Sequence, residues 1–162
     1  MKAPRTRWRW EHRRDGEKIN EWENKNLVTA EGLQYLQNAT FFGGDQATAF
    51  YVAIYSDSHE PSADDSYSAP GYTESADYSD GTRPTWAGIR ISSTQLSNTS
   101  NKAAFTMSGN DSVIYGAALV SGKGKGDATG GGVLYCIAPF ASPETGIQSS
   151  DVLYAEIMIE VE

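Results

Sequence analysis

Cysteine is nearly absent from this chain of 162 residues. The one cysteine, Cys136, has no partner within the chain, so disulfide bonds do not determine the fold. It lies inside an apolar run, Val133–Ala138, and this setting predicts a small buried side chain rather than a reactive thiol.

Long hydrophobic runs are also absent. No segment approaches the ~20 apolar residues that a membrane-spanning helix needs, and the residues that follow Met1 lack the apolar core of a signal peptide. These features predict a protein that is not secreted and has no membrane partner.

Basic residues are missing from a long part of the sequence. Residues 26–82 contain nine acidic side chains and no lysine or arginine. Residues 1–18 have the opposite balance, with seven basic and three acidic side chains, so they contribute +4 to a net charge of −8. The remaining residues therefore carry −12. Such a body would repel a polyanion, so we expect no nucleic-acid partner.

The sequence lacks the motifs that common catalytic and cofactor sites require. The glycine-rich segment 121–132 does not match a phosphate-binding loop, because Lys123 is followed by glycine and no helix follows. His12 and His59 have no histidine or cysteine at metal-ligand spacing, and no serine lies in a nucleophile elbow. We predict no catalytic residues, no metal site and no cofactor, and hence a protein that is not an enzyme.

The acidic segment 56–82 has two interpretations. It is long, rich in serine and tyrosine, and typical of a surface loop, with one turn of helix near residues 61–65. Its carboxylates either bind calcium between loops or form a solvated acidic surface, and the absence of EF-hand spacing favours the second interpretation. The carboxylates concerned are Asp57, Glu60, Asp64, Asp65, Asp77 and Asp80.

Short β-strand patterns make up most of the remaining sequence. The central pair, Val113–Val120 and Val133–Ala138, is rich in β-branched and aromatic residues and flanks the glycine-rich segment, as in a hairpin with a long tip. Further strands are predicted at residues 49–55, 86–92, 102–107 and 151–161, with a turn at 142–146.

One helix is predicted, near residues 29–38. Thr29 can cap its first turn, Glu31 favours the positive end of the helix dipole, and Val28, Leu33 and Leu36 form an apolar stripe. About eight strands and one short helix predict an all-β fold, an antiparallel β-sandwich of jelly-roll-like form.

We predict that residues 1–25 form a basic, Arg/Trp-rich N-terminal arm or hairpin, and residues 26–162 the β-sandwich body. Asp15-Gly16 is typical of a two-residue hairpin turn. In one interpretation the hairpin buries its tryptophans in this domain and exposes its arginines. In a compatible one, both residue types anchor a partner protein, because tryptophan and arginine are enriched at interface hot spots. The predicted interface is Arg5, Arg7, Trp8, Arg9, Trp10, Arg13 and Arg14.

Five blocks of the sequence, taken together, resemble the head decoration or capsid cementing proteins of tailed bacteriophages. The blocks are Asn26–Leu33, Phe50–Tyr55, Arg83–Trp86, Asn101–Thr106 and Tyr115–Ala118. The resemblance spans most of residues 18–161 and rests on packing and turn patterns rather than on a chemical signature. It implies a jelly-roll-like sandwich, made in the host cytoplasm, that sits on the capsid exterior of the virion and clamps neighbouring copies of the major capsid protein. Self-association as a dimer or trimer on the lattice is also expected.

An alternative function is a tail-associated receptor-binding or carbohydrate-binding module. It would use exposed aromatic side chains of the acidic segment, namely Tyr67, Tyr72 and Tyr78. In either function Lys123, Lys125, Tyr67 and Tyr72 are candidate loop contacts.

Overall fold

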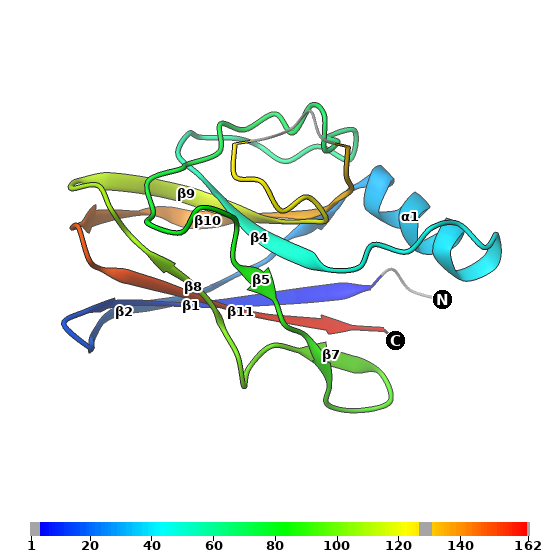
Figure 1. The fold of residues 1–162 in the computed structure, drawn as a ribbon, viewed down its shortest axis with the longest axis horizontal. Helices are drawn as coiled ribbons and strands as arrows, with labels where there is room; N and C mark the ends of the chain where they lie inside the picture. The colour runs from blue at the N-terminus through cyan, green and yellow to red at the C-terminus, as the bar shows by residue number, and fades with distance from the viewer. Residues whose placement is uncertain (1–3, 127–130, 162) are drawn as a thin grey trace.

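A computed structural model of the chain describes residues 4–126 and 131–161. The fold is all-β, with one short helix and two antiparallel sheets packed as a sandwich (Figure 1). Part of the predicted glycine-rich tip, residues 127–130, lies outside the described residues.

The first sheet, called sheet A here, is built around the N-terminal and C-terminal strands of the chain. The strand β1 pairs along its whole length with β11, and β2 pairs with β1 on the other side. The order is β2-β1-β11-β7-β6, and β8 pairs with another part of β11. The strands are β1 (Arg5–Arg14), β2 (Glu17–Asn24), β6 (Ile89–Arg90), β7 (Gln95–Ser97), β8 (Ala103–Thr106) and β11 (Val152–Glu160).

Sheet B contains the predicted central hairpin. Its order is β3-β10-β9-β4-β5, so the hairpin strands β9 and β10 are neighbours, as predicted. The long strand β10 also reaches the other sheet, because Asn24 Nδ2 of β2 donates to the carbonyl oxygen of Pro139 at 3.2 Å. The strands are β3 (Leu27–Val28), β4 (Phe50–Tyr55), β5 (Thr85–Trp86), β9 (Ser112–Val120) and β10 (Leu134–Ile147).

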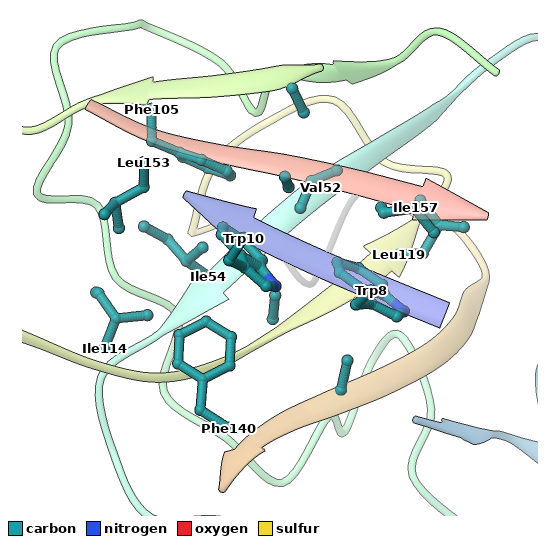
Figure 2. Close-up of a cluster of buried hydrophobic side chains, with 14 of the residues drawn as sticks. Trp8, Trp10, Val52, Ile54, Phe105, Ile114, Leu119, Phe140, Leu153 and Ile157 are labelled. Carbon is teal, nitrogen blue, oxygen red and sulfur yellow. The ribbon is translucent and has the colours of Figure 1, made fainter. Parts of the chain in front are cut away.

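The core lies between the two sheets, and Trp8 and Trp10 of β1 occupy its centre (Figure 2). Both are fully buried, and their rings stack with centroids 6.1 Å apart. Phe140 of β10 packs edge-on against Trp10 at 5.2 Å. Each of these large side chains buries 150–250 Å² of surface, so β1 makes a large contribution to the apolar area removed from water.

Three sequence predictions about strands and turns are wrong. The expected strand 86–92 is split into β5 and β6, which lie in different sheets. Gly88 sits at the crossing, where the Trp86 ring leaves no room for a side chain. A short strand, β7, lies between the expected strands 86–92 and 102–107, where no strand was predicted. The expected turn at 142–146 is part of β10, and the chain turns at residues 148–150 instead.

The helix α1 (Ala30–Phe41) begins as predicted and packs differently. The Thr29 hydroxyl accepts a hydrogen bond from Gly32 N at 3.0 Å and so caps the first turn. The contact with the sheet is made by Gly32, where a Cβ atom would clash with the backbone of Tyr135. Leu33, expected in the apolar stripe, is 36% exposed. A glycine was needed here because the helix lies directly on the backbone of β10.

Candidate partner-binding surface

The N-terminal segment is a hairpin built into sheet A, so of the two forms predicted for residues 1–25, an arm or a hairpin, the chain adopts the hairpin. Strand β1 lies between β2 and β11, so each of its edges is hydrogen-bonded to a neighbouring strand. Alternate residues point to opposite faces of the sheet. Trp8 and Trp10 therefore point into the core, and Arg5, Arg7 and Arg9 point outward.

Trp8 and Trp10 cannot serve as interface anchors. Each is 0% exposed, so neither side chain is available to a partner, and their place in the predicted interface is corrected here. The interpretation that the hairpin buries its own tryptophans is confirmed. The physical reason is that burying a large apolar ring in the core stabilises the folded protein, whereas a ring exposed to solvent contributes little.

Arg9, Arg13 and Arg14 of the predicted interface are each paired with a carboxylate within the molecule. Arg9 contacts Glu23 at 2.9 Å, Arg13 contacts Glu11 at 2.9 Å, and Arg14 contacts Asp151 at 2.8 Å. Carboxylates of β1, β2 and the β10–β11 turn thus neutralise much of the positive charge that the sequence concentrates in residues 1–18. These arginines offer a partner less charge than their number suggests.

A groove of about 820 Å³ lies where β1 starts and β2 and β11 end. Its rim includes Arg5, Arg7 and Lys25, and its apolar lining includes Phe140 of β10 and Met158 of β11. Arg7 stands opposite Met158 in the strand register. Arg7 forms no ion pair with any residue that the structure describes, so its guanidinium can bind a ligand without first breaking a contact. Glu23, Glu160, Thr6, Asn24, Pro139 and Ala141 complete the lining.

The groove combines apolar surface with cationic hydrogen-bond donors. Such a combination suits an extended protein segment that carries an apolar side chain next to a carboxylate, since a guanidinium binds a carboxylate through two parallel hydrogen bonds. Of the predicted interface residues, Arg5 and Arg7 line this groove. Lys25, Phe140 and Met158 belong to the same groove and are absent from the prediction.

A buried ionic network lies at the other end of β1, around His12, which is 1% exposed. Its Nδ1 is 2.7 Å from Glu144 Oε1, and its Nε2 is 2.8 Å from Asp151 Oδ2. Arg14 donates two hydrogen bonds of 2.8 Å to the Asp151 carboxylate, and Asn20 donates one to Glu144. The network connects β1 and β2 of sheet A to the far end of β10.

The geometry of this network gives His12 a structural role. Both ring nitrogens lie within 2.8 Å of buried carboxylate oxygens and the ring is 1% exposed, so neither nitrogen is open to a substrate. The Arg14 guanidinium lowers the pKa of Asp151, and the backbone N–H of Gln148 and the His12 ring lower it further, against the burial that raises it. The sequence could have indicated this position. His12 lies two residues after Trp10, and because alternate side chains of a strand point to the same face, it lies on the inner face with the two buried tryptophans.

The acidic segment 56–82 does not present the predicted aromatic surface. Tyr67 is 6% exposed and Tyr78 is 2% exposed, and Tyr72 stacks on Tyr55 with ring centroids 4.8 Å apart. The sequence suggested exposed rings because their neighbours are polar. The structure instead turns Tyr67 and Tyr78 inward, so the predicted contacts of these two tyrosines are wrong, and Tyr72 is half-buried. The expected helical turn at residues 61–65 is a simple turn.

A buried ion pair holds this segment against the sandwich. Arg83, which is 4% exposed, donates to both oxygens of Glu74 at 2.8 and 2.6 Å. Its other nitrogen donates to the Tyr67 hydroxyl at 2.9 Å and to the Gly122 carbonyl oxygen at 2.8 Å. One guanidinium therefore joins the acidic segment to the loop that follows β9.

The two lysines of the glycine-rich segment differ. Lys125 donates to the carbonyl oxygens of Ala76 and Tyr78 and lies 4.4 Å from the centre of the Tyr78 ring, so it fixes the acidic segment. Lys123 is exposed and remains available to a partner.

The acidic side chains do not gather around one point. Asp65 is held by His59 at 2.8 Å, and Asp57 accepts a hydrogen bond from Thr73 N at 2.9 Å. Within residues 4–126 and 131–161, no group of three or more His, Cys, Asp or Glu side chains is arranged to hold a metal ion. In the same ranges, the helix is too short and too polar to cross a membrane.

Comparison with known proteins adds no relative to this picture. No model of a known protein family matches the chain, and no curated protein is significantly similar to it in sequence.

Proposed function

We propose that this protein is a structural protein of a tailed-bacteriophage virion, which binds the outside of the capsid and cements neighbouring major capsid subunits. Support comes first from the five blocks that resemble decoration proteins. These blocks fall on the scaffold: Phe50–Tyr55 is β4, Tyr115–Ala118 lies within β9, and Asn101–Thr106 contains β8. The blocks supply part of the buried core, including Val52, Ile54 and Phe105, and contain none of the residues that line the groove.

The groove at the start of β1 is the observation that carries the proposal. Its rim arginines stand on a strand that is fixed by stacked, buried tryptophans on the other face. A rigid groove loses little conformational entropy on binding, which makes even a small contact effective. On a capsid, many copies of the binding segment are presented at fixed spacing, so modest individual contacts suffice for stable decoration.

Charge reversal at Arg7 tests the proposal. The variant Arg7→Glu places a carboxylate next to the acidic side chain that the groove is proposed to bind, without touching the core. We expect at least ~10-fold weaker binding to undecorated capsids, the size expected for an interface hot spot. Occupancy is measured by sedimenting capsids with the purified protein.

The matched control is Lys18→Glu, which makes the same change of charge at an exposed site at the start of β2, at the opposite end of that strand from the groove. It should bind capsids like the unaltered protein. Equal occupancy for the two variants would contradict the assignment of the groove. Deletion of residues 1–16 is not an informative test, because it removes β1 and with it the two tryptophans at the centre of the core.

A further inference from the structure

Strand β1 continues past the end of β2. Pairing between β1 and β2 ends at Trp8 and Asn24, whereas pairing between β1 and β11 continues through Thr6. Thr6 therefore has a paired strand on one side and, among the strands that the structure describes, none on the other. This open side belongs to the groove, because Thr6 and Asn24 both line it. The groove thus lies where sheet A lacks the last part of its edge strand.

A hydrogen bond on β11 shows in which direction the backbone of Thr6 points. Asn98, which follows β7, accepts a hydrogen bond from Ile157 N at 2.7 Å. The backbone groups of Ile157 thus point away from β1, because β7 lies on the other side of β11. This direction alternates along a strand, so Met158 is hydrogen-bonded to its partner Arg7 on β1. Thr6, the next residue of β1, therefore points its N–H and C=O groups to the open side.

These polar groups have no partner of their own. Thr6 is 8% exposed, and no hydrogen bond joins its N–H or C=O to another residue in the part of the chain that the structure describes. Buried backbone groups in folded proteins are almost always paired. Beside them Asn24, 9% exposed, donates from Nδ2 to the Pro139 carbonyl oxygen, while its Oδ1 lacks a partner in the same ranges. The groove therefore offers an incoming chain one backbone donor and two oxygen acceptors.

We propose that the protein segment bound in the groove adds to sheet A as a short β-strand, antiparallel to β1 and beyond the end of β2. This inference rests on the proposed function, since it specifies how the capsid segment is held. The residue of the segment opposite Thr6 exchanges two backbone hydrogen bonds with it, as in other antiparallel pairs and in peptide recognition by strand addition. The antiparallel direction is that of every strand pair in sheet A.

Strand addition also determines the order of side chains in the segment. The side chain opposite Thr6 points inward with it, toward the apolar lining that Pro139 and Phe140 provide. The side chains before and after it point outward, on the face where Arg5 and Arg7 stand. Acidic side chains at these two places complement the guanidinium groups. The segment is therefore expected to alternate acidic, apolar and acidic residues, as in Glu-Val-Glu.

Nuclear magnetic resonance of the full chain with the capped peptide Thr-Glu-Val-Glu-Thr tests strand addition without capsids. We expect saturable binding and slower hydrogen exchange of the Thr6 amide, because the bound peptide protects it. Methylation of the valine nitrogen removes the donor to Thr6 and should weaken binding at least ~10-fold. Methylation of the first glutamate nitrogen, which points away from β1, is the matched control and should leave the affinity unchanged.

Three results of this experiment would overturn the proposal. They are absence of binding at millimolar peptide, unaltered exchange of the Thr6 amide in the complex, and equal affinity of the two methylated peptides. The experiment uses the unaltered chain, so it decides the proposal whether or not variants of the protein fold.

Two variants extend the test to the capsid. Thr6→Pro removes an N–H group that the described fold does not use, and Thr6→Val keeps it. Thr6→Pro should bind capsids at least ~10-fold more weakly than Thr6→Val, with thermal denaturation confirming that both are folded. Equal binding of these two variants together with weak binding of Arg7→Glu would overturn strand addition and leave the proposed function intact. Binding of Thr6→Pro and Arg7→Glu at the level of the unaltered protein would overturn both proposals.

Discussion

Replacement of His12 by leucine should destabilise the protein strongly. The side chain is 1% exposed, and leucine is similar to it in volume, so the main change is the loss of two charge-assisted hydrogen bonds to carboxylates. Each such bond contributes about 1.5–3 kcal/mol, which gives a sum of about 3–6 kcal/mol. Arg14 and Asn20 still satisfy part of the two carboxylates, so we expect the lower half of that range, about 3–4 kcal/mol.

Urea denaturation monitored by tryptophan fluorescence measures this loss. Trp8 and Trp10 lie in the core on the same strand as His12, so their emission reports on global unfolding. The matched control is His59→Leu, which removes one hydrogen bond to Asp65 at the edge of a loop. It should cost about half as much or less. Equal losses for the two variants would refute the argument that the paired carboxylates make His12 special.

Three further predictions concern the same scaffold. Arg14 lowers the pKa of Asp151 in the folded protein, so the unfolded chain binds a proton at this carboxylate more readily. The free energy of unfolding should therefore fall as the pH is lowered through about 4, and it should fall less steeply in the variant Asp151→Asn. Urea titrations over a series of pH values measure this difference. Gly32→Ala should destabilise the folded protein by about 1–3 kcal/mol because the new methyl group meets the backbone of Tyr135, although alanine has the better helix propensity. Thermal denaturation tests this, and a raised Tm would contradict it. Trp10→Ala should cost about 3–5 kcal/mol in urea, and a loss below about 1 kcal/mol would contradict its central place in the core.

Local patterns in the sequence determined the long strands of this protein. The alternation of tryptophan and arginine predicts which face of β1 is buried, because successive side chains of a strand point to opposite faces. Asp15 and Gly16, with φ values of 50° and 83°, form the tight turn that their sequence indicates. The start of α1 was equally predictable, since Thr29 caps the turn immediately after it.

The short strands depended on tertiary structure. The strands β3, β5 and β6 contain two residues each and β7 contains three, so none has enough residues to show a period. They exist because a neighbouring strand offers them free backbone groups to pair with. The continuation of β10 through Pro143 has the same cause: Glu144 and Ile147 still pair with β9 across its bulges.

The contact surfaces were decided by tertiary structure as well. The sequence alone placed Arg5 and Arg7 on a basic hairpin, and it gave no means of bringing Phe140 and Met158 beside them. His12 meets Glu144 and Asp151 across separations of 132 and 139 residues, and such partners are set by strand order. Periodicity is a local property of the chain and so fixes the face on which a side chain lies. Which residues it meets there depends on how distant strands pair, and only the folded sandwich determines that pairing.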